Sequence, residues 1–449
     1  MRIVALDKES KQSILNDLLK RSPNNYSQYE STVNQIIEKV RAEGDKALFD
    51  YTLQFDKFAL SAENIRVTKE EIAEAYAQMD ENLIDVIRQS AENIRAFHQK
   101  QLRNSWFDAK PDGTILGMKI TAIERAGVYV PGGKAAYPSS VLMNVIPAKV
   151  AGVDEIIMTT PPGKDGKVNP GTLVAADIAG VDTIYKVGGA QAIAAMAFGT
   201  QSVPKVDKIT GPGNIFVATA KRMVSGIVGI DAVAGPTEIA IIADKGANPS
   251  WLAADLIGQA EHDELAGSVL ITDSEELADK VQESLRYRVP RTEHAERVNT
   301  SLRGRQSGII LTDGIEQSID AANAYAAEHL EVQTADPDAV IAKIRNAGAI
   351  FRGPYSPVPL GDYMSGSNHV LPTSGTARFA AGLGVHTFMK PVEVIEYDEQ
   401  GLKTLAARVN AFAVSEDLPA HGECVLSRFI DDPYDKATIK EQEEQAGLR

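Results

Sequence analysis

The chain contains a single cysteine, Cys424, among its 449 residues. An intrachain disulfide and a zinc cluster built from cysteine thiolates are therefore excluded, because each needs at least two thiols. The scarcity of thiols also restricts the possible chemistry. Oxidation of an aldehyde through a thiohemiacetal would have to use Cys424, and no nucleophile motif surrounds this residue. We interpret Cys424 as a small, partly buried side chain on a helix.

Long apolar runs and clusters of positive charge are also scarce. No uncharged stretch approaches the length of a membrane span, and the first eight residues contain no sustained apolar segment. The formal net charge of −15 opposes binding to nucleic acid or to an anionic membrane, since no dense run of Lys and Arg offsets it. We expect a soluble protein of the cytoplasm that binds neither nucleic acid nor membrane.

The composition is that of a globular protein with large cores. Hydrophobic residues make up 44% of the chain and charged residues 24%. A length of 449 residues exceeds what a single core usually supports, so two or more domains are expected.

Residues 27 to about 105 are predicted to form helices. Gly44 is a natural helix stop after the first apolar stripe, and Thr68 with Glu71 fits a capping box that opens a later helix. His98 continues an apolar stripe at helical spacing, so we interpret it as a hydrogen-bonded histidine of the core.

From about residue 121, short β-rich runs alternate with alanine-rich helical ones, which is typical of βα units and a parallel sheet. The sequence Ala-Gly-Val-Asp occurs at 151–154 and again at 179–182, each time before a strand-like run. A second α/β region follows, and from about residue 402 the pattern is helical again. The strands predicted for the second region are Ile239–Ala243, Ser268–Thr272, Gly308–Leu311 and Ala349–Phe351.

Three glycine-containing loops follow strand-like runs, at Tyr129–Gly133, Val187–Gln191 and Gly211–Asn214. Glycine in such a loop lets backbone N–H groups approach a phosphate or a ribose. None of the loops is a dinucleotide fingerprint. The third begins with the G-x-G of such a motif, but Phe216 stands where its last glycine would be. Plain turns would explain each loop singly. Three of them at the ends of successive strands favour a ligand-binding edge of the sheet.

Gln259-Ala260-Glu261-His262 places an amide oxygen and an imidazole three residues apart in a chain with only seven histidines. On a helix, residues i and i+3 share a face, so both side chains can turn toward one ion. Zinc accepts oxygen and nitrogen ligands, and these two side chains would supply half of a four-ligand shell. A solvated helix face is the alternative interpretation of the same spacing.

Three further groups of polar residues accompany this pair. Glu328 and His329 end a predicted helix, where a carboxylate can activate water and an imidazole can accept an alcohol proton. Asp362 lies in a glycine-rich loop and either completes an ion shell or makes an Asx-turn. Glu416 and His421 stand near the C-terminus, so they can join the others only if the segment folds back or reaches a neighbouring subunit.

Together these motifs resemble those of the histidinol dehydrogenase family, and the resemblance extends from the first helices to about Phe429. It implies an α/β fold of two incomplete Rossmann-like domains with small helical N- and C-terminal pieces, in an intertwined homodimer. The implied parts are residues 1–25 as the N-terminal helical piece, 26–126 with 237–388 as the metal and substrate domain, 127–236 as the NAD-binding domain and 389–449 as the C-terminal helical dimerisation arm. The resemblance is most specific in Gly127–Ala151, Gly211–Val217, Ala234–Glu238, Gln259–Glu264, Glu328–Leu330 and Gly361–Thr373.

The same resemblance implies the reaction. L-Histidinol would be oxidised to L-histidine through bound L-histidinaldehyde, with two NAD molecules reduced in succession, as the last two steps of histidine biosynthesis. One zinc ion per subunit would be held by the positions matching Gln259, His262, Asp362 and His421, and would position the substrate's imidazole and amino nitrogens.

The remaining roles follow from the same matched positions. His329 corresponds to the general base and Glu328 to the carboxylate that activates water. Tyr129, Gln191 and Asn214 correspond to NAD-contacting residues. The implied substrate contacts are the zinc ligands, Glu328 and His329, together with Thr237, His369 and Glu416. Thr237 stands where the family often has serine, so only a minor change in substrate fit is expected, and the segments matching His421, Glu416 and His369 are expected to cross into the partner's site.

Two other functions remain open. A relative in the same superfamily that oxidises another small alcohol, such as a sulfopropanediol, would share most of the motifs but have an altered imidazole pocket. A zinc hydrolase would also need a water-activating glutamate, but it would have no use for three glycine loops or for NAD. Without a cysteine nucleophile, oxidation of an aldehyde needs its hydrate, and therefore both a water activator and a proton acceptor.

Overall fold

The computed structural model describes residues 1–6, 26–132 and 137–429. It divides into two compact units, which are described separately. The first unit comprises Met1–Leu102 and Ala122–Met389, and the second comprises Arg103–Thr121 and the chain from Lys390 onward. Among the described residues, no helix is both long enough and apolar enough to cross a membrane.

The first unit contains a five-stranded sheet in which every neighbouring pair of strands is parallel. In spatial order the strands are β6 (Thr183–Tyr185), β5 (Glu155–Thr159), β4 (Arg125–Tyr129), β7 (Lys208–Thr210) and β8 (Gly229–Ile230). The βα pattern predicted from about residue 121 is confirmed. Gly152 and Gly180, the repeated glycines, both end helices in the left-handed conformation, where a residue without a side chain costs least.

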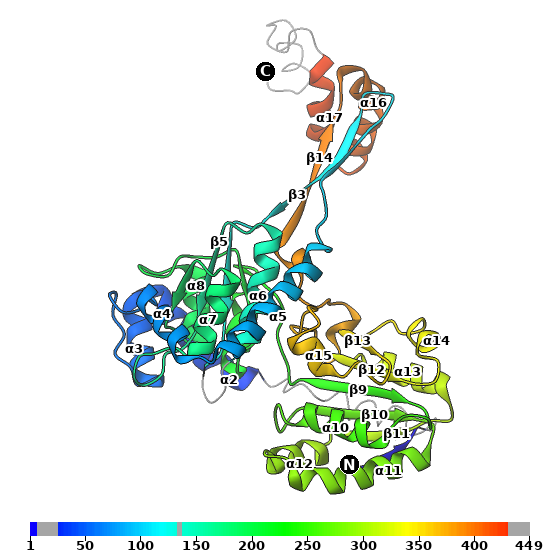
Figure 1. Cartoon of the computed structure of the whole chain (residues 1–449). Helices are drawn as coiled ribbons and strands as arrows, with labels where there is room; N and C mark the ends of the chain where they lie inside the picture. The colour runs from blue at the N-terminus through cyan, green and yellow to red at the C-terminus, as the bar shows by residue number, and fades with distance from the viewer. Residues whose placement is uncertain (7–25, 133–136, 430–449) are drawn as a thin grey trace, which may run out of the picture. The chain divides into compact units, whose positions relative to one another are not determined.

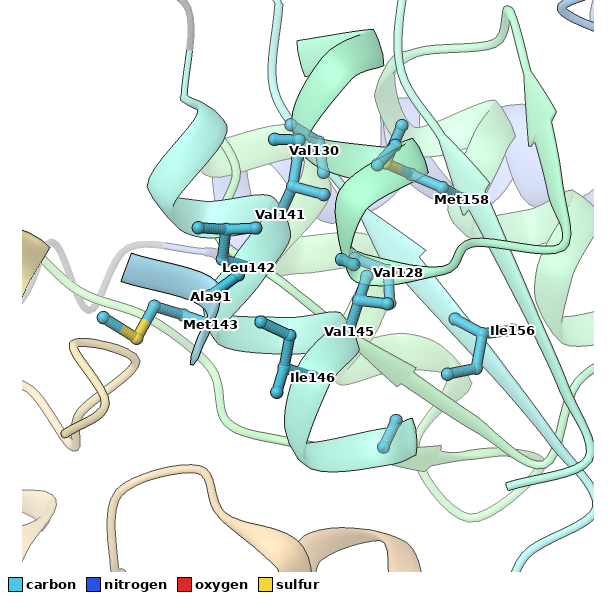
Figure 2. Close-up of a cluster of buried hydrophobic side chains, with 14 of the residues drawn as sticks. Ala91, Val128, Val130, Val141, Leu142, Met143, Val145, Ile146, Ile156 and Met158 are labelled. Carbon is cyan, nitrogen blue, oxygen red and sulfur yellow. The ribbon is translucent and has the colours of Figure 1, made fainter. Parts of the chain in front are cut away.

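Helices cover both faces of this sheet. On one face are α4 (Lys69–Gln78), α5 (Glu81–Gln99), α6 (Pro138–Ala151) and α7 (Pro170–Ala179), and on the other are α2 (Ser27–Glu43), α3 (Asp45–Phe55), α8 (Gly189–Phe198) and α9 (Ile215–Val224). Strand side chains alternate between the two cores. Val128 of β4 and Val130 just after it pack in the first core with α5 and α6, as Figure 2 shows, whereas Tyr129 belongs to the second.

This packing differs from the predicted grouping of residues 26–126 with 237–388. The apolar stripes of α2 and α5 are buried in the two cores of the five-stranded sheet, because that is where their helical faces find apolar partners. The predicted capping box of Thr68 and Glu71 is confirmed, and Gly44 ends α2 with a positive φ of 58°. His98 is buried, as predicted, and its Nδ1 lies 2.8 Å from the carbonyl oxygen of Ile94.

A six-stranded sheet, also parallel throughout its neighbouring pairs, forms the rest of the first unit (Figure 1). Its strands in spatial order are β1 (Ile3–Ala5), β11 (Gly308–Leu311), β10 (Gly267–Thr272), β9 (Glu238–Ala243), β12 (His329–Gln333) and β13 (Ala349–Arg352). The four predicted strands are confirmed. Residues 3–5 add an edge strand where a helical piece was predicted for 1–25, and residues 7–25 lie outside the described chain.

Helices flank this sheet on both sides. One face is covered by α13 (Ile315–Tyr325) and α14 (Pro337–Ile341), and the other by α10 (Pro249–Ala260), α11 (Glu275–Arg288) and α12 (Ala295–Arg303). Leu330 and Val332 of β12 join the α13 core. By the alternation of a strand, His329 and Glu331 point to the opposite face, where α10 lies.

The segment after β13 is tied to the helices of the five-stranded sheet. It contains α15 (Val358–Tyr363) and the short 3-10 helices Thr376–Arg378 and Val385–Phe388. Ser90 Oγ of α5 donates to the carbonyl oxygen of Tyr363 at 2.5 Å. Asn368 donates through its side-chain amide to the carbonyl oxygen of Met143 at 2.7 Å. These bonds fix both ends of the loop that follows α15.

The second unit is a small α+β structure (Figure 1). A three-stranded sheet in the order β14 (Met389–Glu396), β3 (Ile115–Ala122) and β2 (Trp106–Ala109) accompanies the paired helices α16 (Glu399–Ser415) and α17 (Pro419–Leu426). The C-terminal piece at 389–449 was predicted to be helical, so β14 is a correction. Its strand character comes from alternating Val, Glu and Ile residues. Cys424 is exposed rather than partly buried.

Candidate active site

The central element of the site is a carboxylate held at the amino ends of two neighbouring strands. β9 and β12 are parallel, with His329 opposite Ile239, so Glu328 arrives beside the start of β9. Thr237 Oγ1 donates to Glu328 Oε2 at 2.5 Å, and the N–H of Glu238 donates to the same oxygen at 3.0 Å. The carboxylate is thereby fixed from two sides, and its second oxygen remains for other contacts.

Burial gives Glu328 an unusual acidity. Its side chain is almost inaccessible, and this desolvation raises the pKa of the Glu328 carboxyl to about 7, while the hydrogen bonds from Thr237 and Glu238 act in the opposite direction. A carboxylate whose pKa lies near neutrality is a better base than an ordinary glutamate. Glu328 can therefore accept a proton from water near pH 7.

His329, the first residue of β12, has one ring nitrogen engaged and one available. Its Nδ1 lies 3.1 Å from the carbonyl oxygen of Glu238. A carbonyl can only accept, so Nδ1 carries the proton and Nε2 keeps its lone pair. Nε2 is buried and has no hydrogen-bond partner among the described residues. Burial also lowers the pKa of His329, which keeps the ring neutral and able to accept a proton.

The local backbone differs from the prediction that Glu328 and His329 end a helix. α13 ends at Tyr325, and Ala326 adopts a left-handed φ of 53° that breaks the helix. Glu328 and His329 therefore sit at a strand entrance, where the sheet fixes the backbone on both sides.

Gln259 and His262 lie at the end of α10. Gln259 is buried, and its Nε2 donates to Thr237 Oγ1 at 2.8 Å, which connects it to Glu328 through one hydroxyl. The amide oxygen of Gln259 is left for another partner. The helix ends at Ala260, and the N–H of His262 donates to the carbonyl oxygen of Gln259 at 3.3 Å. The two residues thus belong to one turn, although only Gln259 is helical.

Asp362 and His369 complete the cluster from the α15 segment. Asp362 is helical rather than in the predicted loop, and burial raises the pKa of its carboxyl to about 6. His369 Nδ1 lies 4.0 Å from Asp362 Oδ1, and Ser140 Oγ of α6 lies 3.4 Å from His369 Nε2. Burial lowers the pKa of His369 to about 4. His369 lies beside Asp362 of its own chain.

A buried polar network supports three of these elements from behind. Gln333 Nε2 donates to Glu331 Oε2 at 2.8 Å and to Asp255 Oδ2 at 3.2 Å, while the N–H of Val358 donates to Glu331 Oε1 at 3.3 Å. These bonds join β12 to α10, which carries Gln259, and to α15, which carries Asp362. Desolvation and the neighbouring Asp255 carboxyl raise the pKa of Glu331. Sequence reasoning missed this network, because HLEVQ has no special pattern beyond strand alternation.

The donors in the cluster suit zinc in their chemistry. Gln259 Oε1, His262 and Asp362 offer the oxygen and nitrogen ligands that zinc accepts. The Asp362 carboxyl is largely shielded from water, and the imidazole beside it, His369, is neutral, as expected of a carboxylate that a cation would neutralise. Among the described residues no group of three or more His, Cys, Asp or Glu side chains has metal-binding geometry. A fourth predicted ligand, His421, belongs to the second unit.

Glu416 and His421 flank the turn between α16 and α17 in the second unit. Glu416 follows the last residue of α16, Asp417 has a positive φ of 60°, and His421 lies in the first turn of α17. Both side chains are exposed. They thus stand on either side of one turn, on a surface of the second unit.

The three predicted glycine loops meet at one cavity. It has a volume of about 780 Å³ and lies at the carboxyl ends of β4 and β6. Its lining includes Tyr129, Gln191 and Asn214, the three residues matched to NAD contacts. A cavity of this size is appropriate for a dinucleotide or a large part of one. Sequence reasoning missed another lining residue, Asp56, because it follows an ordinary amphipathic helix without a motif.

Backbone geometry explains why glycines and Asn214 are needed there. Gly211 has a φ of 114°, and a Cβ on it would lie 2.0 Å from the carbonyl oxygen of Tyr129. Asn214 caps α9, accepting from the N–H groups of Phe216 at 3.0 Å and Val217 at 3.2 Å. The buried oxygen Oε1 of Gln191 has no hydrogen-bond partner among the described residues. A residue with an unsatisfied acceptor thus lines the cavity, beside closely approaching backbone.

The fold and these two clusters define an α/β enzyme with a dinucleotide-sized cavity and a separate acid–base centre. The histidinol dehydrogenase family model matches residues 19–429. Histidinol dehydrogenase of Bifidobacterium longum is 64% identical over 93% of this chain and 91% of its own length, and that of Clostridium acetobutylicum is 52% identical over 89% and 92%. A crystal structure of histidinol dehydrogenase from Elizabethkingia anophelis aligns with a TM-score of 0.89 at 35% identity, covering 96% of this chain and 98% of that one.

The chain therefore belongs to the histidinol dehydrogenase family, the NAD-dependent oxidoreductases of the final steps of histidine biosynthesis. The resemblance inferred from the motifs is confirmed, and so is an α/β fold with parallel sheets.

Proposed function

We propose that this chain oxidises L-histidinol to L-histidine through enzyme-bound L-histidinaldehyde, transferring two hydrides to two NAD molecules in succession. The observation that carries the proposal is the Glu328–His329 pair. A near-neutral carboxylate and an imidazole with a free lone pair stand at adjacent positions, beside Gln259 and Asp362. The balanced reaction consumes histidinol, two NAD⁺ and one water and yields histidine, two NADH and three protons.

In the first oxidation, His329 Nε2 accepts the alcohol proton while a hydride leaves the carbinol carbon for NAD. The aldehyde then needs a water molecule, because a hydride leaves readily only from a carbon that bears an oxygen able to release its proton. Glu328 takes a proton from the attacking water. Protonated His329 returns its proton to the aldehyde oxygen as the water adds, so its neutral ring can accept the hydroxyl proton of the hydrate as the second hydride departs. The exposed Cys424 of the second unit has no part in this scheme.

The proposed zinc site consists of Gln259, His262 and Asp362 of one chain and His421 of its partner. When bound, zinc supplies positive charge and coordination positions for the substrate's imidazole and amino nitrogens. The chain's own contribution is to hold these ligands in place. The hydroxyl of Thr237 fixes Gln259 relative to Glu328. The α15 helix places Asp362 close enough to Glu328 and His329 to interact with both electrostatically. Thr237, His369 and the partner's Glu416 are proposed to contact the substrate.

We further propose that the two sheets form incomplete Rossmann-like halves and that Tyr129, Gln191 and Asn214 contact NAD in the cavity between the glycine loops. Glycine-lined carboxyl ends of parallel strands are the usual place for such a ligand. The free oxygen of Gln191 supplies an acceptor for a ribose hydroxyl or an amide.

The partner is proposed to be a second copy of this chain in an intertwined homodimer. The second unit exposes more large apolar side chains than a small monomeric surface usually carries, and a dimer interface would bury them. Glu416 and His421 lie on the same unit, so a copy that docks there would receive them. The exposed apolar residues of this unit are Trp106, Phe107, Val392, Ile395, Tyr397, Val409, Phe412, Val414 and Leu418.

Subunit mixing tests the shared site. His262→Ala and His421→Ala homodimers should each be inactive, whereas a heterodimer keeps one complete site. Random pairing of equal amounts should therefore restore about a quarter of the wild-type activity, because half of the dimers have one intact site of two. The matched control is a mixture of His262→Ala and Asp362→Ala. Both changes lie in the same unit, so no heterodimer site is complete and no activity should return.

Confirmed subunit exchange without recovery in the His262→Ala and His421→Ala mixture would contradict the shared site. Exchange is followed independently, by labelling one variant with a donor fluorophore and the other with an acceptor.

A further inference from the structure

Asp56 is a carboxylate that the proposed reaction does not use. It follows the last residue of α3, its N–H donates to the carbonyl oxygen of Thr52 at 2.9 Å, and its side chain lines the cavity of the glycine loops. The oxygen Oδ2 is shielded from solvent and has no hydrogen-bond partner among the described residues. Burying a carboxylate without a donor is costly, so a ligand that supplies donors would relieve this cost.

The surroundings identify the kind of donor. Asp56 lines the cavity together with Tyr129 and Gln191, which are proposed to contact NAD. A vicinal diol offers two O–H donors with the spacing of a carboxylate's two oxygens, and NAD carries such a diol on each ribose. An added phosphate on the same ribose would place negative charge against the carboxylate and would remove one of the donors.

The two faces of the five-stranded sheet decide which ribose is meant. Asp56 lies at the end of α3, which belongs to the core shared by α2, α8 and α9. The α15 segment, which carries Asp362 and His369 of the site, is tied to the other face, since Ser140 of α6 contacts His369 and Asn93 of α5 donates to the carbonyl oxygen of Met364 at 2.7 Å. The nicotinamide has to reach the catalytic face. The adenosine end of the dinucleotide is therefore the end that meets Asp56.

We propose that Asp56 accepts hydrogen bonds from the 2′- and 3′-hydroxyls of the adenosine ribose and thereby selects NAD over NADP. This assignment rests on the proposed cofactor cavity. The two lysines that line the cavity do not reverse this preference for NAD over NADP. Lys167 is paired with Glu74 at 2.6 Å, and Lys164 lies on the loop after Pro162, where it can meet the pyrophosphate. Burial raises the pKa of Asp56 to about 6, so the group is still largely ionised above neutrality.

Equilibrium binding of NADH and NADPH to the zinc-loaded enzyme, followed by nicotinamide fluorescence without histidinol, tests the assignment. Wild-type enzyme should bind NADH at least about a hundredfold more tightly than NADPH. Asp56→Asn should weaken NADH binding by about tenfold, the usual loss for a hydrogen bond to a charged group, and should narrow the preference over NADPH by at least that factor. Asp56→Ser is the second variant, for use if the asparagine variant does not fold.

The matched control is Asp50→Asn on the same helix. Asp50 forms ion pairs with Lys39 at 3.0 Å and with Lys46 at 3.3 Å, and it does not line the cavity, so neither dinucleotide should bind differently. Unchanged NADH binding in Asp56→Asn would overturn the proposal, and so would an equal weakening of NADH and NADPH. NADPH binding by the wild type as tight as NADH binding would also overturn it.

The outcome does not depend on the proposed substrate, because no histidinol is present in the assay. If Asp56→Asn changes dinucleotide selection but the wild type leaves histidinol unoxidised, the proposed function fails and the assignment of Asp56 stands. If histidinol is oxidised with two NADH but Asp56→Asn binds both dinucleotides normally, only the assignment fails.

Discussion

Replacing Glu328 with glutamine should separate the two oxidations. Both hydrogen bonds to Glu328 end on the same oxygen, at 2.5 Å from Thr237 Oγ1 and at 3.0 Å from the N–H of Glu238. The amide oxygen of glutamine can take that place and keep both bonds. The variant therefore loses the negative charge and the basicity of the side chain, while the Thr237 bridge to Gln259 remains.

The size of the expected rate loss follows from the loss of this basic group alone. A positioned general base contributes about 10²- to 10⁴-fold to a rate, so loss of a water-activating carboxylate should slow the second oxidation by at least about a hundredfold, or about 2.7 kcal/mol in activation free energy. The first oxidation uses His329 Nε2 and should change by no more than about threefold. Burial of a neutral amide costs less than burial of a carboxylate, so thermal stability should not fall.

The assay is single-turnover stopped-flow measurement of NADH with excess enzyme and NAD over histidinol. The wild type should form two NADH per histidinol, whereas Glu328→Gln should form the first at nearly the normal rate and the second slowly. Glu316→Gln is the matched control, because it makes the same substitution on the surface of α13, where Glu316 pairs with Lys343 outside the site, and it should leave both steps intact.

The pH dependence provides an independent check. The pKa of Glu328 is raised to about 7, so the fraction of carboxylate grows as the pH rises through about 7, and the rate of the second oxidation should rise with it. Glu328→Gln should lack this rise. An equal loss of both oxidations in the variant, or a second oxidation at the wild-type rate, would refute the role of Glu328 as water activator.

Two further changes test the residues that support the site. Thr237→Val removes the hydroxyl that links Glu328 to Gln259, so we expect at least about a tenfold loss in kcat/KM and faster loss of zinc to a chelator. Thr237→Ser keeps the hydroxyl and should stay close to wild type. Equal effects of both variants would argue against the hydroxyl bridge. For Glu331, burial and Asp255 raise the folded-state pKa above its unfolded value, so this group's contribution to stability is complete below the ordinary glutamate pKa and is lost as the pH rises. The melting temperature of Glu331→Gln should therefore be higher than that of the wild type, and this difference should grow as the pH rises from about 5 to about 8. A difference in melting temperature that does not change with pH would contradict the raised pKa.

The sequence predicted the parallel strands and the chemistry-bearing residues well, because both depend on local patterns. Strand runs such as Gly308–Leu311 are short, apolar and bounded by turn residues, so their position can be predicted without a partner. The repeated Ala-Gly-Val-Asp marks two helix ends, because a left-handed residue there requires glycine. Motif matching then identified the family from the residues of the site.

What the sequence could not predict is how distant segments pair. α2 to α5 are amphipathic and would cover either sheet equally well, and only the shape of the five-stranded sheet's two cores selects their position. β1 pairs with β11 across some three hundred residues, which no local pattern reports. Glu328 and His329 appeared to end a helix because Ala-rich sequence precedes them, whereas Ala326 breaks that helix through its left-handed backbone.

The site shows the same contrast between local patterns and long-range contacts. The sequence predicted which residues carry the chemistry, but it could not predict which of them touch. The hydroxyl of Thr237 joins Gln259 to Glu328 across three elements, and the Asp255–Glu331–Gln333 network lies behind them. Asp56 had no motif, and its importance comes only from its place in the cavity lining and from a side-chain oxygen without a hydrogen-bond partner among the described residues.

The most direct test of the central claim is the stoichiometry of NADH formed from L-histidinol. The absorbance of NADH at completion, with limiting histidinol and excess NAD, should correspond to two NADH for each histidinol, with histidine as the product. One NADH per histidinol with accumulation of the aldehyde would contradict the four-electron scheme, and no NADH at millimolar histidinol would contradict the proposed substrate.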